Sequence, residues 1–166
     1  AFQDPVGPEW SQTRRSITPN GGREYLGDFA NTNVTLTVSN LPPHTNLVIS
    51  FSLYLLRTWD GNGNCCGGPD VWSLAIDGGD TLIRTSFSHT GGAGNRQAYP
   101  GSYPVADNPA MTGAFQENTL GYSYDLGSEP TPYDAVYRIV VPVAHGDESV
   151  VFRFASSGSQ GLADES

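Results

Sequence analysis

Apolar and polar residues alternate one by one along the longer apolar stretches of this sequence. In the segment NVTLTVS, Val34, Leu36 and Val38 fall on one side and two threonines on the other. A period of two is typical of strands with one buried and one solvated face, as in antiparallel sheets. No window of a dozen residues keeps apolar residues at helical spacing, so we expect an all-β chain. The same alternation recurs in residues 46–58, 71–77, 135–143 and 149–155.

Glycine and proline divide these stretches into short pieces. Residues 40–46 read as a tight strand connection, and residues 76–80 (IDGGD) and 144–149 (AHGDES) as hairpin turns. Pro142 inside an apolar stretch indicates an edge strand or a bulge. With further strands expected near 25–30, 81–87 and 120–125, the pattern predicts one antiparallel β-sandwich domain over 1–166, of jelly-roll and lectin-like or carbohydrate-binding-module-like type.

The charge balance restricts the partners. Only 15% of residues are charged and the net charge is −9, which disfavours nucleic acid and anionic membrane surfaces. No apolar run reaches the roughly 18 residues of a membrane span. A composition rich in Gly, Ser, Thr, Asn and Tyr, with a glycosylation sequon at Asn33, points to a secreted, extracellular protein. Metal cations and neutral polymers such as glycans suit this balance best.

The segment WDGNGNCCGGPD (59–70) is the first candidate site. Asp60, Asn62 and Asn64 are spaced so that a turn can direct three oxygen ligands at one cation, and Asp70 can supply a fourth. Such oxygen ligands suit Ca²⁺. The positions that would complete an EF-hand loop hold other residues, so the predicted calcium site is of another kind. A solvated turn, with side chains bonding their own backbone, is the alternative.

Two adjacent cysteines lie inside the same segment. Cys65 and Cys66 cannot form a CxxC redox or zinc motif. A vicinal disulfide, two free thiols and cross-links to other chains all stay open.

Aromatic side chains suggest a ligand surface. Tyr99 and Tyr103 lie in a long irregular segment (88–117), and we expect them to be exposed, with Trp59, for stacking on sugar rings. No nucleophile motif such as G-x-S-x-G is found, so we expect a protein that is not an enzyme. The alternative is an enzyme, a glycosidase that would use a pair of carboxylates.

Several stretches together resemble a module of large secreted multidomain bacterial proteins, often planctomycete-like, and of some eukaryotic extracellular proteins. The resemblance is carried by residues 6–11, 25–45, 53–62, 68–79, 82–88, 97–101, 118–122, 136–139 and 160–166, which include WDGN, GPDVW and QGLADES. It implies a jelly-roll sandwich, and by analogy with similar sandwiches a second calcium site at Asp4, Asp164 and Glu165.

The resemblance also bears on the end of the chain. Such modules end in DESWG followed by an IDNV-like last strand, whereas this sequence stops at Ser166. We therefore expect a chain that lacks its last strand or is excised from a larger protein.

Three functions follow as hypotheses. The leading one is a calcium-stabilised, non-catalytic extracellular binding or adhesion module for a glycan or cell-surface polymer. The second is a structural subunit of an extracellular filament or sheath. That subunit would assemble by strand exchange with copies or neighbouring domains, and residues 1–10 would be the donated arm. The third is a glycan-active hydrolase.

Overall fold

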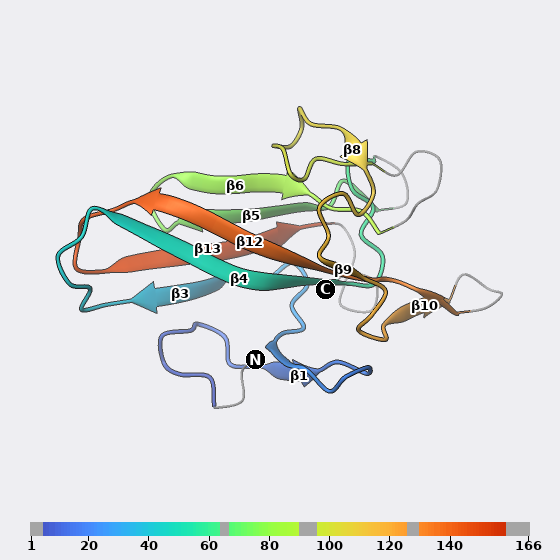
Figure 1. The fold of residues 1–166 in the computed structure, drawn as a ribbon, viewed down its shortest axis with the longest axis horizontal. Helices are drawn as coiled ribbons and strands as arrows, with labels where there is room; N and C mark the ends of the chain where they lie inside the picture. Colours follow the sequence, from blue (N-terminus) through green and yellow to red (C-terminus); the bar gives the residue numbers. More distant parts are fainter. Residues whose placement is uncertain (1–4, 64–66, 90–95, 126–129, 159–166) are drawn as a thin grey trace.

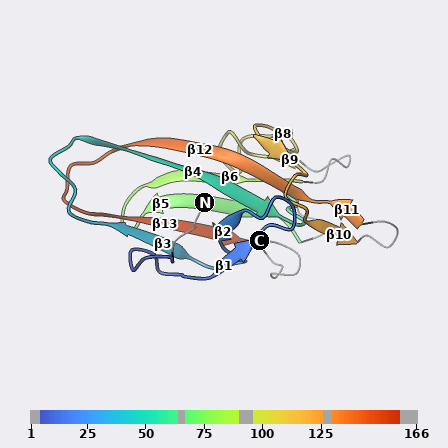
Figure 2. The same ribbon diagram turned by 60° about the horizontal axis from the view of Figure 1, so that its bottom comes forward.

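The computed structural model describes residues 5–63, 67–89, 96–125 and 130–158 of the 166-residue chain. These residues form strands, turns and irregular segments, without a helix. Two antiparallel sheets account for the longer strands and lie one above the other as two layers, as Figures 1 and 2 show. The prediction of an all-β, antiparallel chain is confirmed.

The larger sheet has the strand order β3-β13-β5-β6 and the smaller one β4-β12-β9. Their bounds are β3 Val34–Val38, β13 Val150–Ser157, β5 Val71–Ile76, β6 Thr81–Ser86, β4 Asn46–Leu56, β12 Asp134–Ala144 and β9 Gln116–Glu117. Three two-stranded sheets complete the fold: β1 (Arg15–Ile17) with β2 (Glu24–Leu26), β7 (Arg96–Gln97) with β8 (Asn108–Pro109), and β10 (Ser123–Asp125) with β11 (Pro130–Pro132).

The core lies between the two layers, where the alternating apolar residues of both sheets meet. Phe87, the residue directly after β6, is fully buried in the middle of this core. Its ring lies 4.6 Å from the ring of Tyr137 on the opposite sheet and 6.3 Å from that of Trp72. Aromatic pairs at such distances stabilise a core beyond the area that they bury. The inward faces expected from the period of two are therefore the faces that pack.

The turns follow the sequence in part. Residues 77–80 form the expected hairpin between β5 and β6, where Gly78 adopts a φ of 72°. Residues 145–149 do not form a hairpin, because they connect β12 to β13 in the opposite sheet. Residues 39–45 likewise lead from β3 in one sheet to β4 in the other. Residues 77–80 and 145–149 both have the glycine and aspartate of a turn. The sequence therefore could not distinguish a hairpin within one sheet from a connection between the two sheets.

Pro142 occupies an edge position, as expected. Asn118 N donates to Asp134 O and Phe115 N to Val136 O, so even-numbered residues of β12 direct their backbone groups toward β9. β9 pairs only with Ala135 and Val136. The backbone nitrogen of Pro142, which carries no hydrogen, therefore lies on the side of β12 where no described strand pairs with this residue.

Segments of the same chain cover the outer edges of the larger sheet. Along β3, Ser11 N donates to Thr35 O at 3.0 Å and Thr37 N to Glu9 O at 2.8 Å. Along β6, Tyr99 N donates to Ser86 O at 3.2 Å. Glu9 and Trp10, the last two residues of the arm 1–10 that the filament hypothesis would donate, thus pair within their own chain.

Candidate ligand-binding pocket

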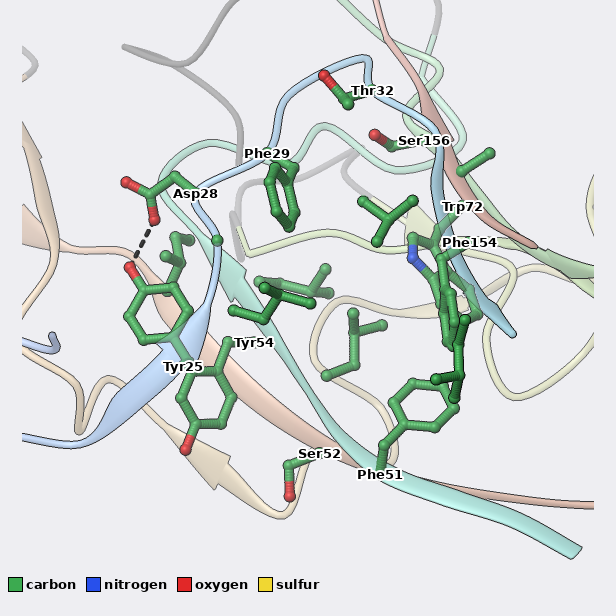
Figure 3. A pocket seen from close by; sticks show the side chains of 18 of the residues that line it. Tyr25, Asp28, Phe29, Thr32, Phe51, Ser52, Tyr54, Trp72, Phe154 and Ser156 are labelled. Atoms are coloured by element: carbon green, nitrogen blue, oxygen red, sulfur yellow. Dashed lines mark hydrogen bonds between the residues drawn. The ribbon is translucent and has the colours of Figure 1, made fainter. Parts of the chain in front are cut away.

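A pocket of about 390 Å³ opens between the two sheets. It is bounded by the inner face of β4, by β2 and the segment that follows it, and by the end of β13. In Figure 3, Phe29 projects into its centre, Tyr25 and Tyr54 lie on one side, and Phe51, Trp72 and Phe154 lie on the other. Ligand sites are typically concave, mostly apolar and roughly 300–1,000 Å³ in volume.

The walls of this pocket are aromatic and apolar. The ring of Tyr25 lies 5.4 Å from that of Tyr54, and the ring of Phe51 lies 5.4 Å from that of Phe154 and 6.1 Å from that of Trp72. All three tryptophans of the chain line it: Trp10, Trp59 and Trp72. The pocket therefore suits an apolar group, and tryptophan fluorescence can report on its contents.

One side of the pocket carries a polar cluster. The hydroxyl of Tyr25 donates to Asp28 Oδ1 at 2.5 Å, a bond drawn in Figure 3, and lies 2.5 Å from the hydroxyl of Tyr122. Arg57 forms an ion pair with Asp28 at 3.8 Å. Burial, followed by the hydrogen bond to Asp28, raises the pKa of Tyr25 well above its ordinary value. Tyr25 is therefore a neutral donor, and Asp28 is the acceptor that a polar ligand atom would meet.

The structure places the side chain of Asp70 beside the backbone of Asp60. The carboxylate of Asp70 accepts a hydrogen bond from the backbone N–H of Asp60, and Asp70 N donates to Gly61 O at 3.0 Å. Asp70 is 1% exposed and Asp60 is 7% exposed. The side chain of Asn62 links other segments, since it donates to Ala106 O at 2.9 Å and accepts from Ser86 Oγ at 2.5 Å. Asn62 therefore connects the 59–63 segment to the end of β6 and to the segment around Ala106.

Other predicted site residues fall outside the described ranges: Asn64, Cys65, Cys66, Asp4, Asp164 and Glu165. Among the described residues, no group of three or more His, Cys, Asp or Glu side chains is placed to hold a metal ion. Asn33 is exposed, as a glycosylation acceptor must be.

The aromatic residues expected to stack on sugars lie elsewhere than predicted. Trp59 is 4% exposed and belongs to the core. Tyr99 lies between core rings, 5.0 Å from Phe87 and 5.1 Å from Tyr137. The predicted exposure of Trp59 was wrong, and Tyr99 is half-buried, because an aromatic residue in an irregular segment can still pack against the core. Tyr103 is half-buried, with the Arg84 guanidinium 5.1 Å above its ring.

Two buried polar residues escaped the sequence interpretation. Asp134 accepts four backbone hydrogen bonds: Thr119 N at 2.8 Å and Leu120 N at 2.9 Å on Oδ1, and Gly121 N at 3.0 Å and Tyr122 N at 3.2 Å on Oδ2. This one carboxylate orders the segment that carries Tyr122 to the polar cluster.

The second is His89, which is buried behind the 57–60 segment. Its Nδ1–H donates to Arg57 O at 2.5 Å. Burial, only partly offset by this bond, lowers the pKa of His89 to about 4. No pattern around either residue distinguishes it from an ordinary strand or loop position.

Comparison with known protein families, characterised proteins and solved structures finds no match. Within the described residues, no helix is long and apolar enough to cross a membrane. The pocket and its surroundings are therefore the basis for a functional assignment.

Proposed function

We propose that this protein is a non-catalytic extracellular binding module that holds an apolar group of its ligand in the pocket between the two sheets. The observation that carries the proposal is the aromatic pocket of about 390 Å³ itself. An acyl chain or a ring system fits its walls, and a hydroxyl or amide head on the ligand fits Asp28 at the polar side. The partner is then a glycan or surface polymer that bears such an apolar substituent.

The composition of the pocket favours binding over hydrolysis. Glycoside hydrolysis generally uses two carboxyl groups. Asp28 is the single carboxylate among the described residues that line the pocket. A bare sugar is also a poorer fit, because sugar rings need exposed aromatic faces, whereas Trp59 is buried and Tyr99 packs against the rings of Phe87 and Tyr137.

The remaining parts of the proposal rest on the sequence. A jelly-roll connection of the strands, secretion, and a calcium ion held near Asp60 and Asp70 all belong to it. The proximity of the two residues supports the calcium site, since the Asp70 carboxylate accepts a hydrogen bond from Asp60 N and oxygen ligands of this kind suit Ca²⁺.

Fluorescence titration tests the proposal directly. We expect a straight-chain fatty alcohol to change the emission of the three pocket tryptophans in a saturable manner, and an unsubstituted oligosaccharide to leave it unchanged. Phe29→Ala should weaken binding about tenfold, the equivalent of about 1.4 kcal/mol, because its ring projects into the pocket. Phe115→Ala is the matched control, since Phe115 lies beneath Arg138 and does not line the pocket. Equal affinity in both variants, or no saturation, would rule out this site.

A further inference from the structure

Strand β4 directs every second peptide group away from its own sheet. Arg57 N donates to Tyr133 O at 2.8 Å. These two residues stand opposite each other when the register that pairs Leu55 with Ala135 is continued by two residues. Odd-numbered residues of β4 therefore bond to β12, because bonded and non-bonded pairs alternate in antiparallel ladders. The even-numbered residues, among them Val48 and Ser50, present N–H and C=O groups to the opposite edge. No described strand pairs with that edge.

This edge lacks the devices that usually protect one. Edge strands are commonly short, or carry lysine, proline or inward charges. β4 is 11 residues long, and its sequence NLVISFSLYLL contains neither charge nor proline. Val48 is 67% exposed, and Ser50 and Ser52 are exposed beside it. Tyr25 packs on Tyr54 at the far end, so the open part of the edge spans residues 46–52.

We propose that this edge pairs with the same edge of a second copy, antiparallel and across a twofold axis at Ile49. Val48 then lies opposite Ser50 of the second copy, and Asn46 opposite Ser52 of the second copy. The two smaller sheets join into one continuous sheet through hydrogen bonds from the even-numbered residues.

The edge can pair with a second copy of itself without charge repulsion and with apolar side chains in contact. Residues 46–52 carry no ionisable side chain, so two copies meet there without repulsion although each chain carries a net charge of −9. On the inner side of the pair, Ile49 meets Ile49 of the second copy, and Leu47 meets Phe51 of the second copy. Residues 49–52 also line the pocket, so the paired edge borders the pocket, but the pairing rests on the edge and on no particular ligand.

Sedimentation equilibrium of two serine variants tests the pairing. Ser50→Pro removes an N–H that points to the open edge and makes no bond to β12, so the fold tolerates it while the pairing does not. We expect the wild-type chain and Ser50→Ala to sediment as dimers and a folded Ser50→Pro to sediment as a monomer. A wild-type chain that stays monomeric at high concentration, or a folded Ser50→Pro dimer, would overturn the proposal.

Cross-linking tests the register and does not depend on the proline variant. In a background with Cys65→Ser and Cys66→Ser, Ile49→Cys brings two thiols together at the twofold axis and should give a disulfide-linked dimer on oxidation. Leu53→Cys is the control, because the two copies of that residue lie roughly 26 Å apart along the paired strands. Cross-linking of Leu53→Cys in preference to Ile49→Cys contradicts the proposed register.

Discussion

His145 Nδ1 lies 2.9 Å from His44 Nε2, and this contact joins the two connections that pass from one sheet to the other. His44 Nδ1–H donates to Pro42 O at 2.7 Å, which leaves its Nε2 as the acceptor for the Nδ1–H of His145. The two rings lie 5.1 Å apart, centroid to centroid. The pair therefore holds together the end of the sandwich that lies away from the pocket.

We predict a favourable coupling between these two histidines. His44→Ala, His145→Ala and the double variant form a cycle whose interaction energy should be about 1 kcal/mol, a usual net value for one hydrogen bond. Urea unfolding of the four proteins measures it. Additive single effects would show that the contact does not stabilise the fold.

Replacing Asp134 should be among the most damaging single substitutions. Asp134→Asn turns one acceptor oxygen into an N–H₂ group that faces backbone donors, so two of the four hydrogen bonds are lost. We expect a loss of about 3 kcal/mol in the free energy of unfolding, because hydrogen bonds to buried charge are strong. Asp147→Asn, on an exposed turn, should change stability by no more than about 0.5 kcal/mol. Chemical denaturation of both variants compares them.

Stability should decrease as the pH falls from 6.5 toward 4, with His89 as one source. The unfolded histidine binds a proton near its ordinary pKa of 6.5, whereas the folded His89 does so only near 4. Because the unfolded state binds more protons in this range, acid favours unfolding, by about 3 kcal/mol over the full interval.

Comparison with a variant isolates the contribution of His89. The pH profile of His89→Gln should lack this component, even though the variant is less stable throughout. Wild-type and variant profiles that run parallel between pH 4 and 6.5 would contradict the assignment.

Calcium should raise the melting temperature if a cation sits near Asp60 and Asp70. A ligand at 100 times its dissociation constant adds about 2.7 kcal/mol to folding, which corresponds to a rise of several degrees. Asp60→Asn and Asp70→Asn should abolish the rise, and Asp80→Asn, in the exposed β5–β6 turn, should keep it. The measurement is the melting temperature of the wild type and of each variant, with excess calcium and with a chelator. A calcium effect that survives both loop substitutions would place the ion elsewhere.

The alternation of apolar and polar residues made most of the long strands predictable from the sequence. The inward positions of β4, β5, β12 and β13 could be assigned before any partner was known, because a period of two depends only on the strand itself. The pairing of strands could not be assigned in the same way. The turn at residues 144–149 has hairpin chemistry, yet the two strands that it joins belong to different layers.

The candidate site was less predictable for a related reason. Its lining comes from segments distant in the sequence, such as Tyr25, Phe51 and Phe154, and no short motif marks their meeting. Trp59 and Tyr99 looked like surface residues because they lie in glycine- and proline-rich segments, but the core had space for both. Asp134 looked like an ordinary strand residue, since the four backbone groups that it binds lie 12–15 residues earlier.

The proline in β12 also limits how many copies can join. Polymerisation by sheet extension needs two open edge strands in each subunit, so that each subunit can pair with a neighbour on both sides. Pro142 interrupts one side of the smaller sheet, and segments 9–11 and 99–103 occupy the margins of the larger one. Within the two larger sheets of the described residues, β4 is left as the one long uninterrupted open edge. A subunit with one such edge can pair with one other subunit only. Pairing through β4 therefore gives a dimer and does not extend into a filament.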